Sequence, residues 1–258
     1  MPACAYCREI APATAEHIWP EKIIARYKSL LTYNNRNQSF HGGEPTIKDV
    51  CEKCNSGKLS QLDNYAVSEF DKQIGQIVHS GENLTFAYDH EKLLRFLLKV
   101  SYNSTRSAGT IEHAQLHEKY AKFILNGGPV TSARINLQIV TSAHRLNIET
   151  MKIEERALLP IILRCANIQL KGGLADRFVV KLVAINSYWF YIFISCQPEP
   201  EDVWGALAKG WSNINSAPGI RLLPSIKAIT IAPEQTTYFD PRLIDSFKGA
   251  SRSKPRSK

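Results

Sequence analysis

Two cysteine pairs constrain this chain more than any other feature of its sequence. Cys4 and Cys7 form one C-x2-C pair near the start, and Cys51 and Cys54 form a second. Two residues between cysteines make a tight turn that directs both sulfurs towards one point, and two such pairs supply the four thiolates of a tetrahedral zinc site. Because four thiolates leave no open coordination position, the spacing predicts a structural zinc rather than a catalytic one.

A fixed order of short motifs lies between and after the two cysteine pairs. An acidic residue and a histidine stand before an aliphatic-x-Pro, a Gly-Gly follows, and the second pair continues as C-x2-C-N-x2-K. The elements are Cys4–Cys7, Glu16-His17-Ile18-Trp19-Pro20, Gly42-Gly43 and Cys51–Cys54-Asn55-Ser56-Gly57-Lys58. This ordered set, over roughly the first quarter of the chain, resembles the HNH endonucleases of the ββα-metal class. The resemblance implies two strands and a helix, with a long insertion between the strands.

The resemblance also implies roles for individual residues in hydrolysing a phosphodiester bond. His17 is the expected general base, because a neutral imidazole is available near pH 7. Glu16 and Asn55 are the expected ligands of a catalytic Mg²⁺ or Mn²⁺, which prefer oxygen donors. Lys58, one helical turn after Asn55, is expected to contact nucleic-acid phosphate as a point charge. Since adjacent strand residues point to opposite faces, Glu16 and His17 reach one site only where the strand end is distorted.

Two positions depart from the family pattern. Thr46 stands where the middle Asn of the family orients the histidine through a backbone contact, and Thr is able to hydrogen-bond similarly. Glu16 stands where many members have Asp, so the site must accommodate one more methylene group.

Other readings of the same residues stay open. The main rival is a non-catalytic, zinc-dependent nucleic-acid-binding protein, in which Asn55 is a helix cap and His17 a structural strand residue. A third reading is a nuclease held silent by a regulatory protein partner, as an antiviral-defence or toxin effector, which is an analogy with the family. DNA is the expected substrate, although the residues do not separate DNA from RNA.

Composition limits the class of protein. No apolar run approaches the roughly 18 residues of a membrane span, and the N-terminus has no basic and apolar signal segment, so we expect a cytoplasmic protein with reduced thiols. The net charge is +8, and the last eleven residues supply five of these charges and no acid. Such a tail adds phosphate contacts or merely improves solubility.

The hydrophobic pattern predicts an α+β fold. We expect the HNH nuclease module over 1–70, a helical segment over 71–130, a β-rich C-terminal domain over 131–247 and a basic disordered tail over 248–258. The expected helices are 21–31, one that opens at Asn55, 90–104, 111–125 and 200–216. The expected strands are 15–19, 46–50, 134–141, 161–170, 177–185, 188–196 and 226–232, with a polar loop at 33–39 and an extended stretch at 80–89.

Several other candidate groups have plain structural explanations. His41 is expected in an exposed loop, and is the next candidate for the base after His17. His113 and His117 have the i,i+4 spacing of a metal pair, but a solvated helix face is favoured. Cys165 and Cys196 are expected to be buried, inert thiols. A strand core is favoured over base stacking for the aromatic residues Tyr188, Trp189, Phe190, Tyr191 and Phe193.

Overall fold

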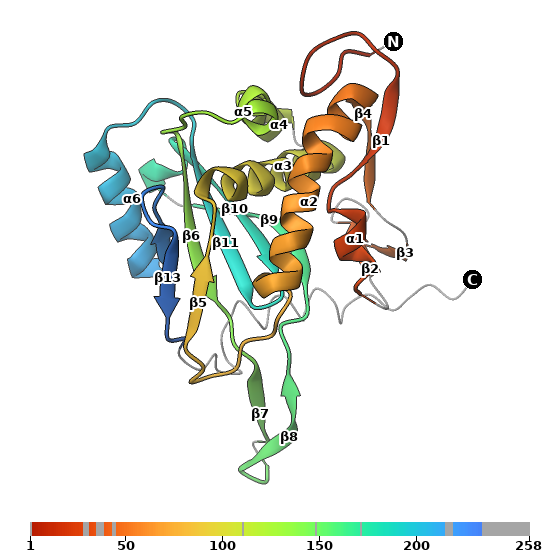
Figure 1. Ribbon diagram of the computed structural model, residues 1–258. Helices are drawn as coiled ribbons and strands as arrows, with labels where there is room; N and C mark the ends of the chain where they lie inside the picture. The colour runs from red at the N-terminus through yellow and green to blue at the C-terminus, as the bar shows by residue number, and fades with distance from the viewer. Residues whose placement is uncertain are drawn as a thin grey trace.

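The computed structural model describes residues 2–27, 31–34, 39–42, 45–109, 111–147, 149–170, 172–214 and 219–233. Helices and antiparallel strands are mixed along these ranges (Figure 1), which confirms the α+β class. Within the same ranges, no helix is both long and apolar enough to cross a membrane. The basic tail, 248–258, lies outside the described residues.

The N-terminal part forms an antiparallel hairpin followed by a long helical stretch. The helical stretch begins and ends with π-helical turns, which are frequent at functional sites. Its buried side is apolar through Leu59, Leu62, Ala66 and Phe70, as the sequence pattern predicts. The elements are β1 (Ala13–His17), β4 (Thr46–Cys51), η1 (Lys53–Leu59), α2 (Ser60–Glu69) and η2 (Phe70–Ile74).

The insertion between β1 and β4 differs from the sequence prediction. α1 covers only Glu21–Ile24, and a short hairpin of β2 (Leu31–Asn34) and β3 (Ser39–Gly42) follows. The predicted helix over 21–31 is therefore too long, and the predicted loop over 33–39 contains strand ends. The residues that open β2 include a threonine and a tyrosine, whose side chains favour extended backbone.

α3 (His90–Ala108) is the longest helix among the described residues and lies in the middle of the molecule (Figure 1). It begins where the Asp89 side chain accepts a hydrogen bond from the Lys92 amide, and it ends at Gly109 with a φ of 71°. Both are strong local signals, an N-cap and a left-handed C-cap. The helix predicted over 111–125 is instead two helices, α4 (Ile111–Glu118) and α5 (Ala121–Asn126), separated by a turn.

A five-stranded antiparallel sheet packs against α3. Its strand order is β12-β6-β11-β10-β9, and β11 is buried along its whole length. The aromatic residues of 188–193 therefore belong to a strand core, as favoured from the sequence. The strands are β6 (Ala133–Ile139), β9 (Leu163–Ile168), β10 (Phe178–Ile185), β11 (Tyr188–Ser195) and β12 (Ile220–Leu222).

The remaining elements extend or cover this sheet. β13 (Ala228–Ile231) pairs with β5 (Leu84–Ala87), and α6 (Glu201–Ile214) packs on the sheet through Trp204, Leu207 and Trp211. The hairpin of β7 (Ala143–Asn147) and β8 (Lys152–Leu158) projects from the body (Figure 1) and was not predicted. The larger of two apolar clusters among the described residues runs from Cys4 to Ile231 and includes residues from all three predicted domains.

The histidine pair of α4 corrects another expectation. His117 is fully buried rather than solvated: its Nε2 lies 2.7 Å from the Ser101 hydroxyl, and its Nδ1 lies 2.6 Å from the His113 carbonyl oxygen. Burial lowers the pKa of His117 to about 3. The ring is therefore a neutral link between α3 and α4.

Cys165 and Cys196 are only partly buried, and burial raises the pKa of both thiols.

Candidate functional site

The four paired cysteines converge on one point. The sulfurs of Cys4, Cys7, Cys51 and Cys54 all lie within 4.8 Å of one another, and all four thiols are free of disulfides. A tetrahedral zinc with Zn–S bonds of about 2.3 Å separates its sulfurs by roughly 3.8 Å. A small contraction of the observed cluster therefore suits the ion, and the four cysteines are able to bind a metal such as zinc.

The pKa values of the cysteine thiols differ within the cluster. Burial raises the pKa of Cys4, but amide groups of Cys51, Cys7 and Tyr6 lower it to about 7. Burial raises the pKa of Cys54. A metal ion removes this difference because it binds all four sulfurs as thiolates. The cluster thereby joins the turn at residues 4–7 to the end of β4 and the start of η1.

His17 is the last residue of β1 and lies directly opposite Thr46 in the β1–β4 register. The pairing register shifts between Thr14 and Glu16, so the hairpin is distorted just before the Glu16-His17 pair. Such a bulge re-aims the side chains that follow it. Neighbouring strand residues such as Glu16 and His17 need a distortion of this kind to reach one site. The His17 side chain is half-buried.

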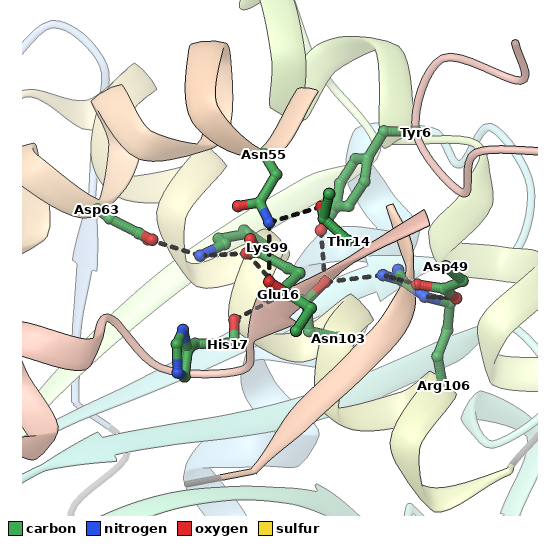
Figure 2. A network of polar contacts seen from close by, with 11 residues as sticks. Tyr6, Thr14, Glu16, His17, Asp49, Asn55, Asp63, Lys99, Asn103 and Arg106 are labelled. Carbon is green, nitrogen blue, oxygen red and sulfur yellow. Dashed lines mark hydrogen bonds and ion pairs between the residues drawn. The ribbon is translucent and has the colours of Figure 1, made fainter. Parts of the chain in front are cut away.

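Asn55 fastens the start of the helix to β1. Its Nδ2 donates to the Thr14 hydroxyl and to the Ala15 carbonyl, both at 2.9 Å. Helical backbone begins at Lys53, so Asn55 lies inside the first turn and is not the N-cap. The cap reading is therefore wrong, because the Asn55 amide bridges to another element instead of to its own helix. Figure 2 shows this amide reaching the strand from the helix.

The Glu16 carboxylate contacts α3 directly and is linked to α2 through Lys99. Its residue is 2% exposed, and its Oε1 lies 2.6 Å from the Nζ of Lys99, which is itself fully buried. The same ammonium lies 2.6 Å from Oδ1 of Asp63. Burial raises the pKa of Glu16, and the positive charge of Lys99 opposes that rise. Two carboxylates thus share one buried cation (Figure 2).

Asn103 of α3 completes the enclosure. Its Nδ2 donates to Glu16 Oε1 at 3.3 Å and to the His17 carbonyl at 3.2 Å. Next along the same helix face, Arg106 forms an ion pair with Asp49 of β4 at 2.8 Å. These contacts were not predicted. A signal existed in the sequence: Lys99, Asn103 and Arg106 interrupt an apolar helix at i, i+4 and i+7, which marks one helical face.

The predicted site residues fall into three groups. Glu16 and His17 end β1, and Asn55 contacts the backbone immediately before them. Lys58 is exposed on η1. His41 belongs to β3, and its side chain lies outside the described part of the structure. The carboxylate predicted to bind a second metal is already occupied, because Lys99 and Asn103 both contact Glu16 Oε1.

Comparisons with protein-family models, curated proteins and solved structures give no match to the chain. Any function therefore has to be argued from the residues and their geometry.

Proposed function

We propose that this protein hydrolyses phosphodiester bonds in nucleic acid, with DNA as the expected substrate and His17 as the general base. One observation carries the proposal. A distorted strand end that bears a histidine is fixed to the first turn of a helix by the Asn55 side chain, beside a four-cysteine cluster. This geometry supports the ββα resemblance of the sequence motifs.

The chemistry assigned to the chain is proton transfer and phosphate binding. In its neutral form, His17 accepts a proton from water as the water oxygen bonds to phosphorus. The bond from phosphorus to the 3′ oxygen breaks, and the leaving oxygen takes a proton from solvent, which gives 5′-phosphate and 3′-hydroxyl ends. A general base in such a role typically contributes about 10²–10⁴-fold in rate. Lys58 is exposed one turn from Asn55, and its ammonium contacts a phosphate of the nucleic acid as a point charge. The four thiolates take no part in bond breaking, because they leave a bound zinc no open position.

A catalytic Mg²⁺ or Mn²⁺ fits this arrangement poorly. Glu16 is buried, and its Oε1 is neutralised by Lys99. A cation at Glu16 requires Lys99 to leave first. When bound in such enzymes, the cation stabilises charge on the phosphate and on the leaving oxygen. The proposal that His17 is the general base therefore does not depend on a divalent ion, or on Glu16 as the ligand of such an ion.

The decisive experiment is cleavage of supercoiled plasmid and of single-stranded RNA by the zinc-loaded full chain. Reactions contain Mg²⁺, Mn²⁺ or EDTA, and the variants are His17→Ala, His41→Ala and Glu16→Gln. We expect His17→Ala to lose about 10²–10⁴-fold in rate with zinc content and DNA binding unchanged. If Glu16 binds the divalent ion, added Mg²⁺ partly rescues Glu16→Gln and does not rescue His17→Ala.

The outcomes separate the alternatives. Loss of cleavage in His41→Ala with full activity in His17→Ala assigns the base to His41. Cleavage that survives EDTA removes the divalent ion from the proposal but keeps the hydrolase. A wild-type chain that binds nucleic acid without cutting it under any condition refutes the hydrolase.

One observation favours a second function, a non-catalytic zinc-dependent nucleic-acid-binding module. The predicted carboxylate ligand already has protein partners, since Glu16 Oε1 is held by Lys99 and by Asn103. A pure binding module needs no open metal site. Under this function, His17→Ala and Glu16→Gln leave nucleic-acid affinity unchanged.

A further inference from the structure

The buried amide of Asn103 lies at the centre of the polar contacts behind the candidate site. Asn103 is fully buried in α3, yet every hydrogen-bonding position of its amide is used. Its Oδ1 accepts from the Tyr6 hydroxyl at 2.5 Å and from Arg106 Nη2 at 3.0 Å. Its Nδ2 donates to the Glu16 carboxylate and to the His17 carbonyl. A buried amide is tolerated only when it is satisfied in this way.

The orientation of this amide follows from its neighbours. A guanidinium only donates hydrogen bonds and a backbone carbonyl only accepts them. The atom that faces Arg106 must therefore be the amide oxygen, and the atom that faces the His17 carbonyl must be the nitrogen. The Tyr6 hydroxyl, which is able to donate or accept, is compatible with this assignment and donates to Oδ1. The opposite orientation would turn contacts on both sides into repulsions.

The contacts of Asn103 join three separate parts of the chain. Tyr6 lies between the cysteines of the first pair, and Arg106 is held by Asp49 of β4 and stacks over the Tyr102 ring at 3.8 Å. Through Asn103, these groups reach the last two residues of β1 (Figure 2). α3 packs against both the N-terminal hairpin and the sheet, so packing on two sides restricts the position of the amide.

We propose that Asn103 is a positioning residue of the candidate site, which holds the His17 backbone and the Glu16 carboxylate in one fixed arrangement. The proposal rests on the proposed function where it concerns rate. Its structural part, the placement of His17, stands apart from cleavage. Asn103 does not touch the substrate; it acts through the end of β1. The site is then completed by α3. This helix lies outside the β1–β4 hairpin and the η1–α2 helical stretch, which the sequence motifs identify.

Asn103→Asp tests the proposal selectively. The substitution keeps acceptors for Tyr6 and Arg106 but replaces the two donors by an oxygen that faces Glu16 and the His17 carbonyl. Supporting groups of this kind typically contribute about 10–100-fold. We therefore expect kcat to fall by about 10–100-fold with KM nearly unchanged, and the imidazole signals of His17 to change in NMR titrations.

A second buried asparagine supplies the matched control. Asn186 is 4% exposed, accepts from the Tyr27 hydroxyl at 2.9 Å and donates to the Gly75 carbonyl at 2.8 Å. Asn186→Asp thus makes the same chemical change beside a tyrosine and a carbonyl, away from β1. We expect it to leave both kcat and the His17 signals unchanged. Tyr6→Phe, which removes one support behind Asn103, should lower kcat in the same direction as Asn103→Asp but by less.

Each result decides something. Folded, zinc-loaded Asn103→Asp with wild-type kcat and unchanged His17 signals overturns the proposal, as does an equal loss in Asn186→Asp. If Asn103→Asp does not fold, Tyr6→Phe decides by the same two readouts. If the wild-type chain does not cleave, the proposed function fails, and the His17 titration alone decides whether Asn103 positions that residue.

Discussion

Removing the ammonium of Lys99 should destabilise the protein strongly. Lys99 is fully buried and lies 2.6 Å from carboxylate oxygens of both Glu16 and Asp63. In Lys99→Met the new side chain is similar in length to lysine but carries no charge. Glu16, which is 2% exposed, is then left without its cation. Breaking a buried pair by removing one partner typically costs about 3–5 kcal/mol, because the remaining charge stays desolvated. Asp63 adds less, since a quarter of its side chain reaches solvent.

The double variant separates charge from packing. Glu16→Gln/Lys99→Met removes both buried charges, and the amide of the new glutamine still accepts from Asn103. We expect this double variant to lose at most about 1–2 kcal/mol relative to wild type. The coupling between positions 16 and 99 should therefore reach at least about 1 kcal/mol, even when Glu16→Gln alone costs nothing. Lys181→Met is a matched control. Lys181 is 3% exposed and donates to the Thr105 hydroxyl at 2.7 Å, and no carboxylate of the described residues pairs with it. Its loss should be neutral or stabilising.

Urea unfolding of the zinc-saturated variants at pH 7.5 measures the free energy of unfolding of each variant. Trp19 is buried two residues after His17, so tryptophan fluorescence reports on this region. A loss below about 1 kcal/mol in Lys99→Met, or a double variant as unstable as the single one, would refute the buried-cation reasoning. Glu16 would then be free to take another cation, as the sequence motifs alone imply.

Two further predictions concern the metal cluster and pH. Cys51→Ser should lose the metal and much of the fold of the first ~70 residues, because metal binding and folding are coupled in small zinc units; under about half an equivalent of zinc in well-folded wild type contradicts this. Folded His117 has a pKa of about 3, below its unfolded value of 6.5, so the unfolded state takes up the proton first. This stabilisation is complete above pH 6.5 and falls by about 1.4 kcal/mol per pH unit towards pH 3. His117→Gln should show a shallower loss of unfolding free energy between pH 6.5 and 5, and an unchanged slope refutes the assignment.

Local signals predicted much of this fold. The cysteine spacing gave the cluster, because a C-x2-C turn fixes its own sulfurs. The apolar pattern predicted a helix over 90–104, and α3 begins at His90 as expected but continues to Ala108, where Gly109 caps it. The strands over 178–185 and 188–195 were predicted because continuous apolar runs are typical of buried strands. The hairpin of β7 and β8 was missed, since its sequence is polar and its pairing is decided by neighbours in space.

The candidate site was predicted only in part, and the reason is the range of its contacts. The motifs identified Glu16, His17 and Asn55, which lie close together in sequence or beside a cysteine pair. They did not indicate what each side chain binds. Asn103 reaches Glu16 across 87 positions, and no local pattern names that partner. A polar face on an apolar helix shows that such a partner must exist, because buried polar groups need one.

Because Asn103 of α3 contacts both the first cysteine turn and the end of β1, a zinc bound by the cysteines is expected to influence the candidate site through α3. Tyr6 lies within the first cysteine turn and holds Asn103, and Asn103 holds the end of β1. Loss of the metal would release this turn, and with it one of the two donors that set the Asn103 amide. The cysteine cluster would then influence His17 by two routes: directly, through the joined ends of β4 and η1, and indirectly, through Tyr6 and α3. An ion with no open coordination position thus has a structural path to the proposed base.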